Sequence, residues 1–187
     1  MMRVIAGLFR SRQLKGKPPA GIRPTSDKLR ETLFNVLGPN VDGCTFLDGC
    51  AGMGGVGIEA ISRGAGFVCF VDQSRKAAAI IRENLQSLDV KEGFRILECD
   101  LAKALDLFER DGTVFDIVFI DPPYEKGALY AESLLAFGTR SLLSDGGVLV
   151  MEHSKRVELA EVVGKLRRYR ILPQGDSNLS FYRTETA

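Results

Sequence analysis

Apolar residues occur along the chain in short, nearly continuous runs that alternate with segments of helical periodicity. The runs at residues 44–48, 67–72, 94–98, 114–120 and 148–152 predict five strands. The intervening periodic segments predict helices at residues 56–63, 74–88, 101–110 and 129–140. Strands that are apolar at almost every position and alternate with helices are typical of a parallel sheet covered on both faces. The pattern therefore predicts a doubly wound α/β fold.

The two ends of the chain show different patterns. Near the N-terminus, basic residues alternate with small and apolar ones, which favours a short β-hairpin. A helix capped by Thr25 or Ser26 should follow. Toward the C-terminus we expect a helix near residues 157–166 and extended segments at 169–172 and 179–182. The apolar face predicted for the first helix consists of Leu29, Leu33, Phe34 and Leu37.

Composition narrows the class of protein. The chain has 187 residues, 45% of them hydrophobic, and a net charge of +1, which predicts one ordered domain. No run approaches the ~20 apolar residues of a membrane span, and the first residues do not resemble a signal peptide. Four cysteines without a CxxC pair and a single histidine, His153, do not form the usual zinc pattern. We therefore expect a cytoplasmic protein with reduced, buried cysteines and neither a metal ion nor a membrane contact.

Charge is distributed unevenly along the chain. Residues 1–30 contain eight basic side chains and one acid, whereas residues 31–150 have a net charge of −8. A basic arm on a mildly acidic body indicates a polyanion bound at one end, although a solvated charged tail would give the same composition. The hairpin pattern of the arm favours the binding interpretation.

Acidic residues stand where four predicted strands end. Asp48, Asp72 and Asp121 close their strands, and Asp100 lies just past the third strand. In a doubly wound sheet, ligands bind outside the carboxyl ends of the strands. A solvated loop acid would explain one such residue, but four at one edge predict a shared pocket.

A glycine-rich turn follows the first predicted strand. Residues 52–57 match GxGxxG, and Asp72 lies 20 residues after Gly52, as in dinucleotide-binding sites. A plain tight turn is the alternative. Asp48 at the mouth of the turn repels a pyrophosphate but suits a cationic ligand. S-adenosyl-L-methionine carries an ammonium and a sulfonium and no phosphate, so this pattern favours it over a nicotinamide cofactor.

The sequence Asp121-Pro122-Pro123-Tyr124 follows the fourth predicted strand. Two prolines cannot continue a central strand, so they form a stiff turn that fixes nearby carbonyl groups. Asp121 and the Pro122 carbonyl are suited to accept both hydrogens of an exocyclic amine while its nitrogen gains positive charge. Tyr124 is suited to stack on the base, a contact of ~1–3 kcal/mol. These residues predict methylation of a base amino group without a metal or a covalent intermediate.

Together these motifs resemble the RsmD-type small-subunit ribosomal RNA guanine-N2 methyltransferases over nearly the whole chain. The matching segments lie at residues 3–7, 23–27, 30–35, 48–54 and 121–124. The resemblance implies the class I methyltransferase fold, Rossmann-like, with a seven-stranded, mostly parallel sheet and an N-terminal β-hairpin extension. It also implies methylation of N2 of one guanine in 16S ribosomal RNA during small-subunit assembly. Cys50 departs from the family, which commonly has phenylalanine there, so we expect weaker aromatic cover of the cofactor.

The resemblance also assigns roles to residues. Residues 1–22 would form the RNA-contacting arm and residues 23–187 the methyltransferase domain, in a monomer that acts on an assembling particle. Arg23 and Arg30 have a structural alternative, because they can pair with Asp27 or Glu31. The expected catalytic residues are Asp121, Pro122 and Tyr124. The expected cofactor-binding residues are Asp48, Ala51, Gly52, Gly54, Asp72 and Asp100. The expected RNA-binding residues are Arg3, Arg10, Arg12, Arg23 and Arg30.

Four alternative functions remain at this point. An adenine-N6 methyltransferase of DNA or RNA would use the same chemistry, but a DNA enzyme normally needs a larger target-recognition region. A protein-glutamine methyltransferase usually has asparagine at the position of Asp121. A nicotinamide oxidoreductase would not bind S-adenosyl-L-methionine. A non-catalytic RNA-binding assembly factor would use the arm but would not depend on Asp121 or Tyr124.

Overall fold

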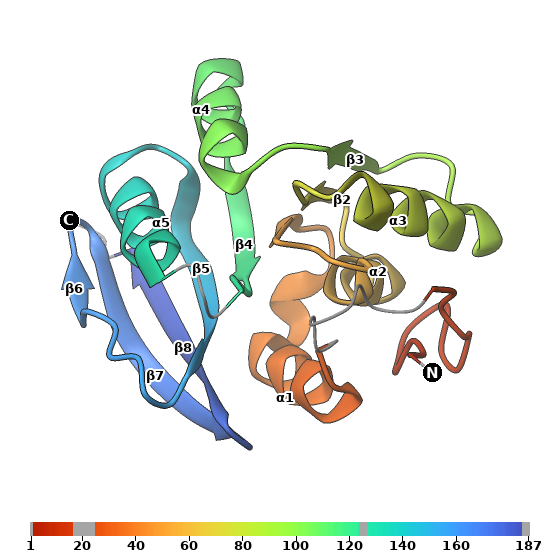
Figure 1. Cartoon of the computed structure of the whole chain (residues 1–187), viewed down its shortest axis with the longest axis horizontal. Coiled ribbons are helices and arrows are strands. Elements are labelled where there is room, and N and C mark those ends of the chain that lie inside the picture. Colours follow the sequence, from red (N-terminus) through yellow and green to blue (C-terminus); the bar gives the residue numbers. More distant parts are fainter. Residues whose placement is uncertain (1, 17–24, 124–126, 185–187) are drawn as a thin grey trace.

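The structure is a computed structural model that describes residues 2–16, 25–123 and 127–184 (Figure 1). The helices are α1 (Asp27–Leu37), the 3-10 helix η1 (Gly38–Val41), α2 (Gly55–Ser62), α3 (Arg75–Ser87), α4 (Leu101–Asp111) and α5 (Gly127–Thr139). The strands are β1 (Thr45–Gly49), β2 (Phe67–Val71), β3 (Phe94–Leu97), β4 (Phe115–Ile120), β5 (Leu143–Ser154), β6 (Val162–Val163), β7 (Leu166–Gln174) and β8 (Ser177–Thr184).

The strands form one sheet in the order β3-β2-β1-β4-β5-β8-β7-β6. The first five strands in this order are parallel, and β8, β7 and β6 are antiparallel to their neighbours. The order reverses between β1 and β4, which is where ligands bind in doubly wound sheets. The predicted doubly wound fold is confirmed. The eighth strand, relative to the expected seven, is the two-residue β6 at the edge of the sheet.

Each face of the sheet is covered by helices, as predicted. Apolar residues of α1, α2 and α3 pack with Phe46, Phe70 and Phe119 in one buried cluster. Residues of α4 and α5 pack with Leu47, Val118 and other strand residues in a second cluster. Because side chains alternate along a strand, neighbouring residues of β1 and β4 contribute to opposite faces. This alternation also fixes which face each acid at the strand ends occupies.

The predicted first helix is confirmed, with Ser26 as its N-cap. The Ser26 hydroxyl accepts a hydrogen bond from the backbone N–H of Leu29 at 3.1 Å. The helix ends before Gly38, which has a φ of 57°. Its buried face contains the four predicted apolar residues and also Arg30. The helix therefore carries a cation into the interior, which the apolar pattern did not indicate.

The helix expected near residues 157–166 is wrong. Residues 157–160 have no regular structure, and β6 and the start of β7 form a small antiparallel hairpin in which Val163 pairs with Leu166. Gly164 turns the chain there with a φ of 56°, and two β-branched valines precede it. The Lys165 N–H donates to the carbonyl of Gly138 at 2.9 Å, which attaches this hairpin to the end of α5. The two predicted extended segments lie within β7 and β8.

The N-terminal arm folds back on itself and packs against the sheet domain. An antiparallel bridge joins Arg3 to Gln13, and the N–H of Leu14 donates to the Met2 carbonyl at 2.9 Å. Val4 and Leu14 are each only 1% exposed and belong to the core cluster on the α1 side. The described part of the arm is therefore a hairpin with one isolated β-bridge and no regular strands. Its apolar residues anchor it, while Arg3, Arg10 and Arg12 stay at the surface.

Two absences hold for the described residues. None of the helices there is long and apolar enough to cross a membrane. No disulfide links the cysteines, of which Cys44 and Cys69 are buried and Cys50 and Cys99 are half-buried.

Candidate active site

Acidic side chains gather at the carboxyl ends of neighbouring strands. Asp48 lies near the end of β1, Asp72 directly after β2 and Asp121 directly after β4. The strands β2, β1 and β4 are adjacent in the sheet, so these three predicted site residues share one edge. Asp100 follows β3 after two further residues and is the N-cap of α4. The acids therefore lie along one edge of the sheet, at the point where the strand order reverses, and the pocket that they are expected to share stays a prediction.

The glycine loop after β1 has a backbone that other residues do not easily adopt. Gly52 and Gly54 have φ angles of 55° and 77°, in the left-handed region. A Cβ on Gly54 would lie 2.9 Å from a side-chain carbon of Ile81, so the loop also packs tightly on α3. Gly54 is the N-cap of α2, and the Ala51 carbonyl accepts its N–H at 2.8 Å. The loop thus brings bare backbone to the edge of the sheet, directly before a helix N-terminus.

Asp72 holds this loop in place. One carboxylate oxygen accepts the N–H of Gly52 at 2.8 Å, and the other accepts the N–H of Ser74 at 2.8 Å. Each oxygen of an ionised carboxylate has two acceptor positions, so both can take another hydrogen bond. Asp72 can therefore fix the loop and accept a pair of ligand hydroxyls at the same time.

Asp48 is buried, with 2% of its surface exposed. Its carboxylate accepts the N–H of Gly57, in the first turns of α2, at 2.7 Å. Burial raises the pKa of Asp48 to about 7, and the charge of Asp72 adds to this effect, against the lowering effect of the Gly57 hydrogen bond. A buried carboxyl in this state is suited to pair with a cationic group that enters beside it.

Asp100 serves first as the N-cap of α4. It accepts the Lys103 N–H at 2.9 Å and forms an ion pair with the Lys103 amine at 3.1 Å. These contacts lower its pKa below the ordinary value for aspartate. The side chain is 41% exposed, so it lies open at the same edge as the other acids.

Asp121 lies directly after β4 and is half-buried, while Pro122 is buried. Burial raises the pKa of Asp121 well above the usual value for an aspartate, and the nearby carboxyl groups of Glu152 and Asp48 raise it further. The carbonyl of Gly49, at the end of β1, accepts the Asp121 N–H at 3.4 Å. Tyr124 and Arg23 lie outside the described residues, so their predicted roles stay predictions.

Sequence reasoning missed Glu152, which closes the predicted fifth strand just as Asp48 closes the first. Glu152 is 8% exposed, and it accepts a hydrogen bond from the Ser177 hydroxyl at 2.9 Å. Its carboxyl interacts with that of Asp121. The signal was present, because the rule that selected the other four acids applies equally to this one.

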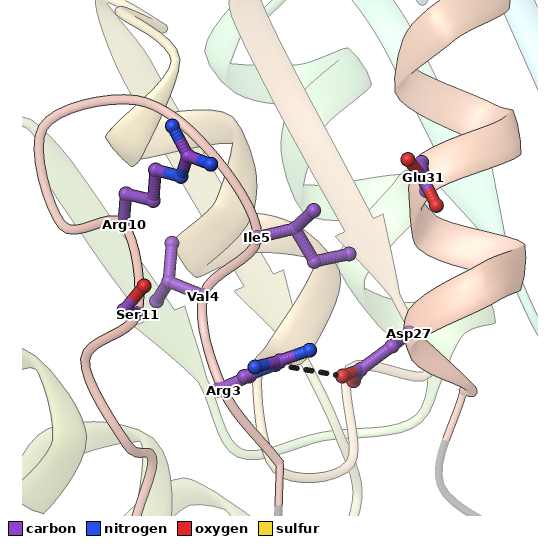
Figure 2. A pocket seen from close by; sticks show the side chains of 7 residues that line it. All are labelled: Arg3, Val4, Ile5, Arg10, Ser11, Asp27 and Glu31. Carbon is purple, nitrogen blue, oxygen red and sulfur yellow. Dashed lines mark hydrogen bonds and ion pairs between the residues drawn. The ribbon is translucent and has the colours of Figure 1, made fainter.

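The arm and the start of α1 enclose a hollow of about 250 Å³ (Figure 2). Arg3 forms an ion pair with Asp27 across it at 3.3 Å, and the Arg3 side chain stays 65% exposed. Arg10 and Arg12 are also exposed, and Arg12 donates to the Ser87 carbonyl at 2.9 Å. Three of the five predicted RNA-binding arginines are thus at the surface of the arm.

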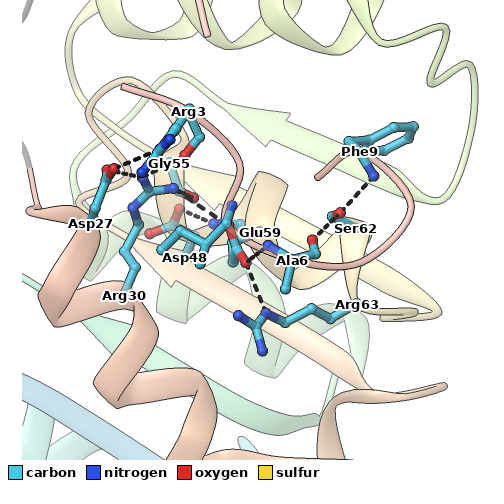
Figure 3. A network of polar contacts seen from close by, with 12 residues as sticks. Arg3, Ala6, Phe9, Asp27, Arg30, Asp48, Gly55, Glu59, Ser62 and Arg63 are labelled. Atoms are coloured by element: carbon cyan, nitrogen blue, oxygen red, sulfur yellow. Dashed lines mark hydrogen bonds and ion pairs between the residues drawn. The ribbon is translucent and has the colours of Figure 1, made fainter. Parts of the chain in front are cut away.

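Arg30 is the exception, and its predicted contact with RNA is wrong. Its side chain is fully buried and bonds to Asp27 at 2.7 Å and to the Arg3 carbonyl at 2.7 Å (Figure 3). It also lies 3.6 Å from Glu59, itself a buried acid of α2. The alternative pairing with Asp27 is confirmed, because position 30 faces the interior on the same side of α1 as Leu33 and Phe34.

Glu59 connects the arm to the site, and sequence reasoning also missed it. Its two carboxylate oxygens accept the backbone N–H groups of Ile5 and Ala6 at 2.8 and 3.0 Å. It forms an ion pair with Arg63 at 2.8 Å (Figure 3). Arg30 in turn donates to the Gly55 carbonyl, at the start of α2, at 3.3 Å. An acid within an otherwise apolar helix segment was the available signal.

Among the described residues, no group of three or more His, Cys, Asp or Glu side chains is arranged to hold a metal ion. The described residues of the site are carboxylates, backbone groups and a glycine loop at the switch point of the sheet. Burial of Asp48 and Glu152 strengthens the electrostatic interactions of these two carboxyls, because a buried charge is screened less than an exposed one.

The chain is similar in sequence to known and putative ribosomal RNA methyltransferases. The family model described as "Conserved hypothetical protein 95" matches residues 2–183. A Bacillus subtilis protein, "Putative rRNA methyltransferase YlbH", is 38% identical over 182 residues, which are 97% of this chain and 98% of that protein. "Ribosomal RNA small subunit methyltransferase D" of Escherichia coli K12 is 33% identical over 186 residues, covering 100% of this chain and 85% of that protein.

Solved structures give the same result. "Putative methyltransferase yhhF" from Escherichia coli has a TM-score of 0.84 at 28% identity and covers 100% of this chain and 99% of its own. A Thermus thermophilus "16S rRNA N2 G1207 methyltransferase (RsmC) in complex with AdoMet and Guanosine" has a TM-score of 0.68 at 23% identity. It covers 89% of this chain and 44% of its own, and it shows a likeness of fold alone.

The sheet order and the loop after β1 define a class I methyltransferase, a class that takes its methyl group from S-adenosyl-L-methionine. The chain belongs to the conserved hypothetical protein 95 family, that of the RsmD-type ribosomal RNA methyltransferases.

Proposed function

We propose that this protein transfers a methyl group from S-adenosyl-L-methionine to the exocyclic N2 of a guanine in small-subunit ribosomal RNA. The observation that carries the proposal is the position of Asp121 and Pro122. They follow β4, the strand that pairs directly with β1, which carries Asp48 and leads into the glycine loop. An amine held by Asp121 would therefore lie beside a ligand held by that loop.

The residues of the first two strand ends fit the cofactor. Asp48 would pair with its ammonium group, and the backbone of Ala51, Gly52 and Gly54 would contact its methionine part. Asp72 would accept the ribose hydroxyls with the acceptor positions that Gly52 and Ser74 leave available. Asp100 would accept the adenine amino group, since its carboxylate is 41% exposed despite the N-cap contact. When bound, the cofactor supplies a methyl group activated by a positively charged sulfur.

The chemistry of the amine explains the residues after β4. The lone pair of an exocyclic amine is delocalised into the base, so the nitrogen is a weak nucleophile. Asp121 and the Pro122 carbonyl would accept its two hydrogens and stabilise the positive charge that grows as the new C–N bond forms. After the methyl transfer the nitrogen would carry one proton more than the neutral product, and the Asp121 carboxylate would receive that proton. Its raised pKa suits that role, since burial disfavours the ionised form.

RNA would approach from the arm. Arg3, Arg10 and Arg12 are exposed on the hairpin and would contact phosphates, which positions RNA without reading its sequence. In this proposal residues 1–22 are the RNA-contacting arm and residues 23–187 the methyltransferase domain. The target guanine must leave its stack to reach Asp121, which is easiest for an unpaired base. We place the reaction in the cytoplasm, on an assembling small subunit, with a monomeric enzyme.

The proposal is tested by incubating the protein with labelled cofactor and small-subunit ribosomal RNA from cells that lack it. Both naked RNA and particles isolated from those cells should be used. We expect label in one guanine and none with Asp121→Ala. Transfer to adenine would support the alternative adenine-N6 activity. RNA binding without transfer by a protein that has bound cofactor would support the assembly-factor alternative.

A further inference from the structure

Glu152 occupies the same face of the sheet as the two carboxyls already placed in the site. Phe119 of β4 pairs with Val150 of β5, and both belong to the buried cluster on the α1 side. Two residues further along each strand lie Asp121 and Glu152. Because side chains return to the same face every second residue, the two acids lie side by side at the end of the strands. Asp48, two residues after Phe46, points to this face as well.

The surroundings of Glu152 hold its carboxyl in one orientation. The residue is 8% exposed, and the Ser177 hydroxyl of β8 donates to one of its oxygens at 2.9 Å. Its position beside Asp121 in the strand register places it within reach of a base that Asp121 holds. Glu152 is thus a second hydrogen-bond acceptor, fixed next to the one that receives the amine.

Two adjacent acceptors distinguish guanine from the other bases that carry an amine. In guanine the 2-amino group stands next to N1–H, so the edge presents donors at both positions. In adenine and cytosine the amino group stands next to a ring nitrogen that is itself an acceptor. A carboxylate that faces the neighbour of the amino group accepts a hydrogen bond from N1–H of guanine. The same carboxylate repels the unprotonated ring nitrogen of adenine or cytosine. A site built around such a hydrogen bond rejects analogues that lack the donor.

We propose that Glu152 is the specificity-determining residue, which accepts N1–H of the target guanine while Asp121 and the Pro122 carbonyl hold its 2-amino group. The inference rests on the proposed function and extends it from the transfer of a methyl group to the choice of base. Ser177 acts through Glu152 as a positioning residue.

The probe that separates the two acceptors is 2-aminopurine riboside, which keeps the 2-amino group but has an unprotonated N1. Binding of guanosine and of 2-aminopurine riboside is measured by NMR on the protein saturated with S-adenosylhomocysteine. We expect the unsubstituted protein to prefer guanosine by about 10-fold or more. Glu152→Gln should reduce this preference to within about 3-fold, because an amide can donate to the unprotonated N1 as well as accept from N1–H.

Asp116→Asn is the matched control. Asp116 is a half-buried carboxylate held by the Ser144 hydroxyl at 2.8 Å, but it lies at the opposite end of β4. Asp116→Asn should leave the preference for guanosine over 2-aminopurine riboside unchanged. Ser177→Ala keeps the carboxyl but removes its fixed orientation, so it should weaken the preference to an intermediate value. This variant also serves as the test if Glu152→Gln does not fold.

The outcomes separate the inference from the proposed function. The role of Glu152 is overturned if Glu152→Gln prefers guanosine over 2-aminopurine riboside as strongly as the unsubstituted protein does. If the glutamine variant does not fold, an unchanged preference in Ser177→Ala overturns it. In that case methylation of guanine in ribosomal RNA would still stand. A protein that methylates no guanine in ribosomal RNA overturns the proposed function itself, whatever the nucleosides show.

Discussion

The carboxylate of Asp48 accepts a hydrogen bond from the backbone N–H of Gly57 at 2.7 Å, across the loop that joins β1 to α2. This contact ties the end of a central strand to the helix that begins beside the site. It also involves a buried carboxyl, and burial raises the pKa of this Asp48 side chain to about 7. The ammonium group of a bound cofactor would stabilise the ionised form of this carboxyl.

The first prediction concerns pH. Cofactor affinity should rise as pH increases through about 7, by up to about tenfold per pH unit below that value, because binding favours ionised Asp48. Asp48→Asn should lower the affinity and remove this dependence. Titration calorimetry between about pH 5.5 and 8 measures both. Identical pH profiles for the two proteins would contradict the pairing with an ammonium group.

The same pKa shift has a consequence for stability without cofactor. Folding raises the pKa of Asp48 from about 4 to about 7. The folded state therefore binds this proton more tightly than the unfolded state, which stabilises the fold at pH values below about 4. This stabilisation is lost as the pH rises through about 7. Asp48→Asn should therefore raise the melting temperature more at pH 8 than at pH 5. If Asp48→Asn lowers the melting temperature equally at pH 5 and pH 8, burial does not disfavour the ionised form of Asp48.

The second prediction separates the two halves of the site. Asp121→Ala should abolish methyl transfer, while cofactor affinity changes by less than about 3-fold. Asp72→Ala should weaken cofactor binding by about 10- to 100-fold, because it removes an ionised acceptor of hydroxyl groups and frees the Gly52 N–H. Cofactor binding is measured by calorimetry and transfer by labelled methyl groups. A loss of affinity in Asp121→Ala equal to that in Asp72→Ala would refute this division.

The third prediction contrasts a buried and an exposed arginine. Arg30→Met should destabilise the fold by about 3–5 kcal/mol, since it removes one of the two cations that pair with the buried Glu59 among the described residues. Arg10→Met should leave stability unchanged, but it should weaken RNA binding and reduce the salt slope by about 1. Denaturant unfolding and RNA titration at several salt concentrations measure the two effects. An unchanged salt slope in Arg10→Met would argue against the arm as the RNA contact.

The fourth prediction concerns the glycine loop. Both Gly52 and Gly54 have positive φ, so alanine at either position should strain the backbone by about 1–2 kcal/mol. Only at Gly54 would the new Cβ meet a neighbour, at 2.9 Å from Ile81, whereas nothing lies within 4 Å at Gly52. Gly54→Ala should therefore lower the melting temperature more than Gly52→Ala. An equal decrease in melting temperature for the two variants would show that the packing of the loop on α3 does not contribute to stability.

Local pattern and spacing predicted most of the fold. The five parallel strands and their helices follow from runs whose period matches one element, as at Phe115–Ile120. The helix prediction around Gly164 failed because the apolar spacing there is compatible with a helix. The φ of 56° at Gly164 and the hydrogen bond to the carbonyl of Gly138 stabilise a hairpin instead. That second partner lies 26 residues earlier in the chain, beyond the reach of a local pattern.

Site residues that lie at the ends of predicted strands could be found from the sequence. Residues whose position depends on contacts between helices could not. Asp48, Asp72 and Asp121 were found because strand ends converge in a parallel sheet. Glu152 satisfies the same rule and was overlooked. Arg30 was misjudged because a charge count does not show which side of α1 a cation occupies, and the partner that holds it, Glu59, comes from another helix.

Identification of the methylated nucleoside tests the central claim most directly. Small-subunit ribosomal RNA from cells lacking the protein is incubated with it and S-adenosyl-L-methionine, digested, and examined by mass spectrometry. The account predicts N2-methylguanosine with the unsubstituted protein and none with Asp121→Ala. The appearance of N6-methyladenosine instead, or of no methylated nucleoside in either naked RNA or assembling particles, would contradict it.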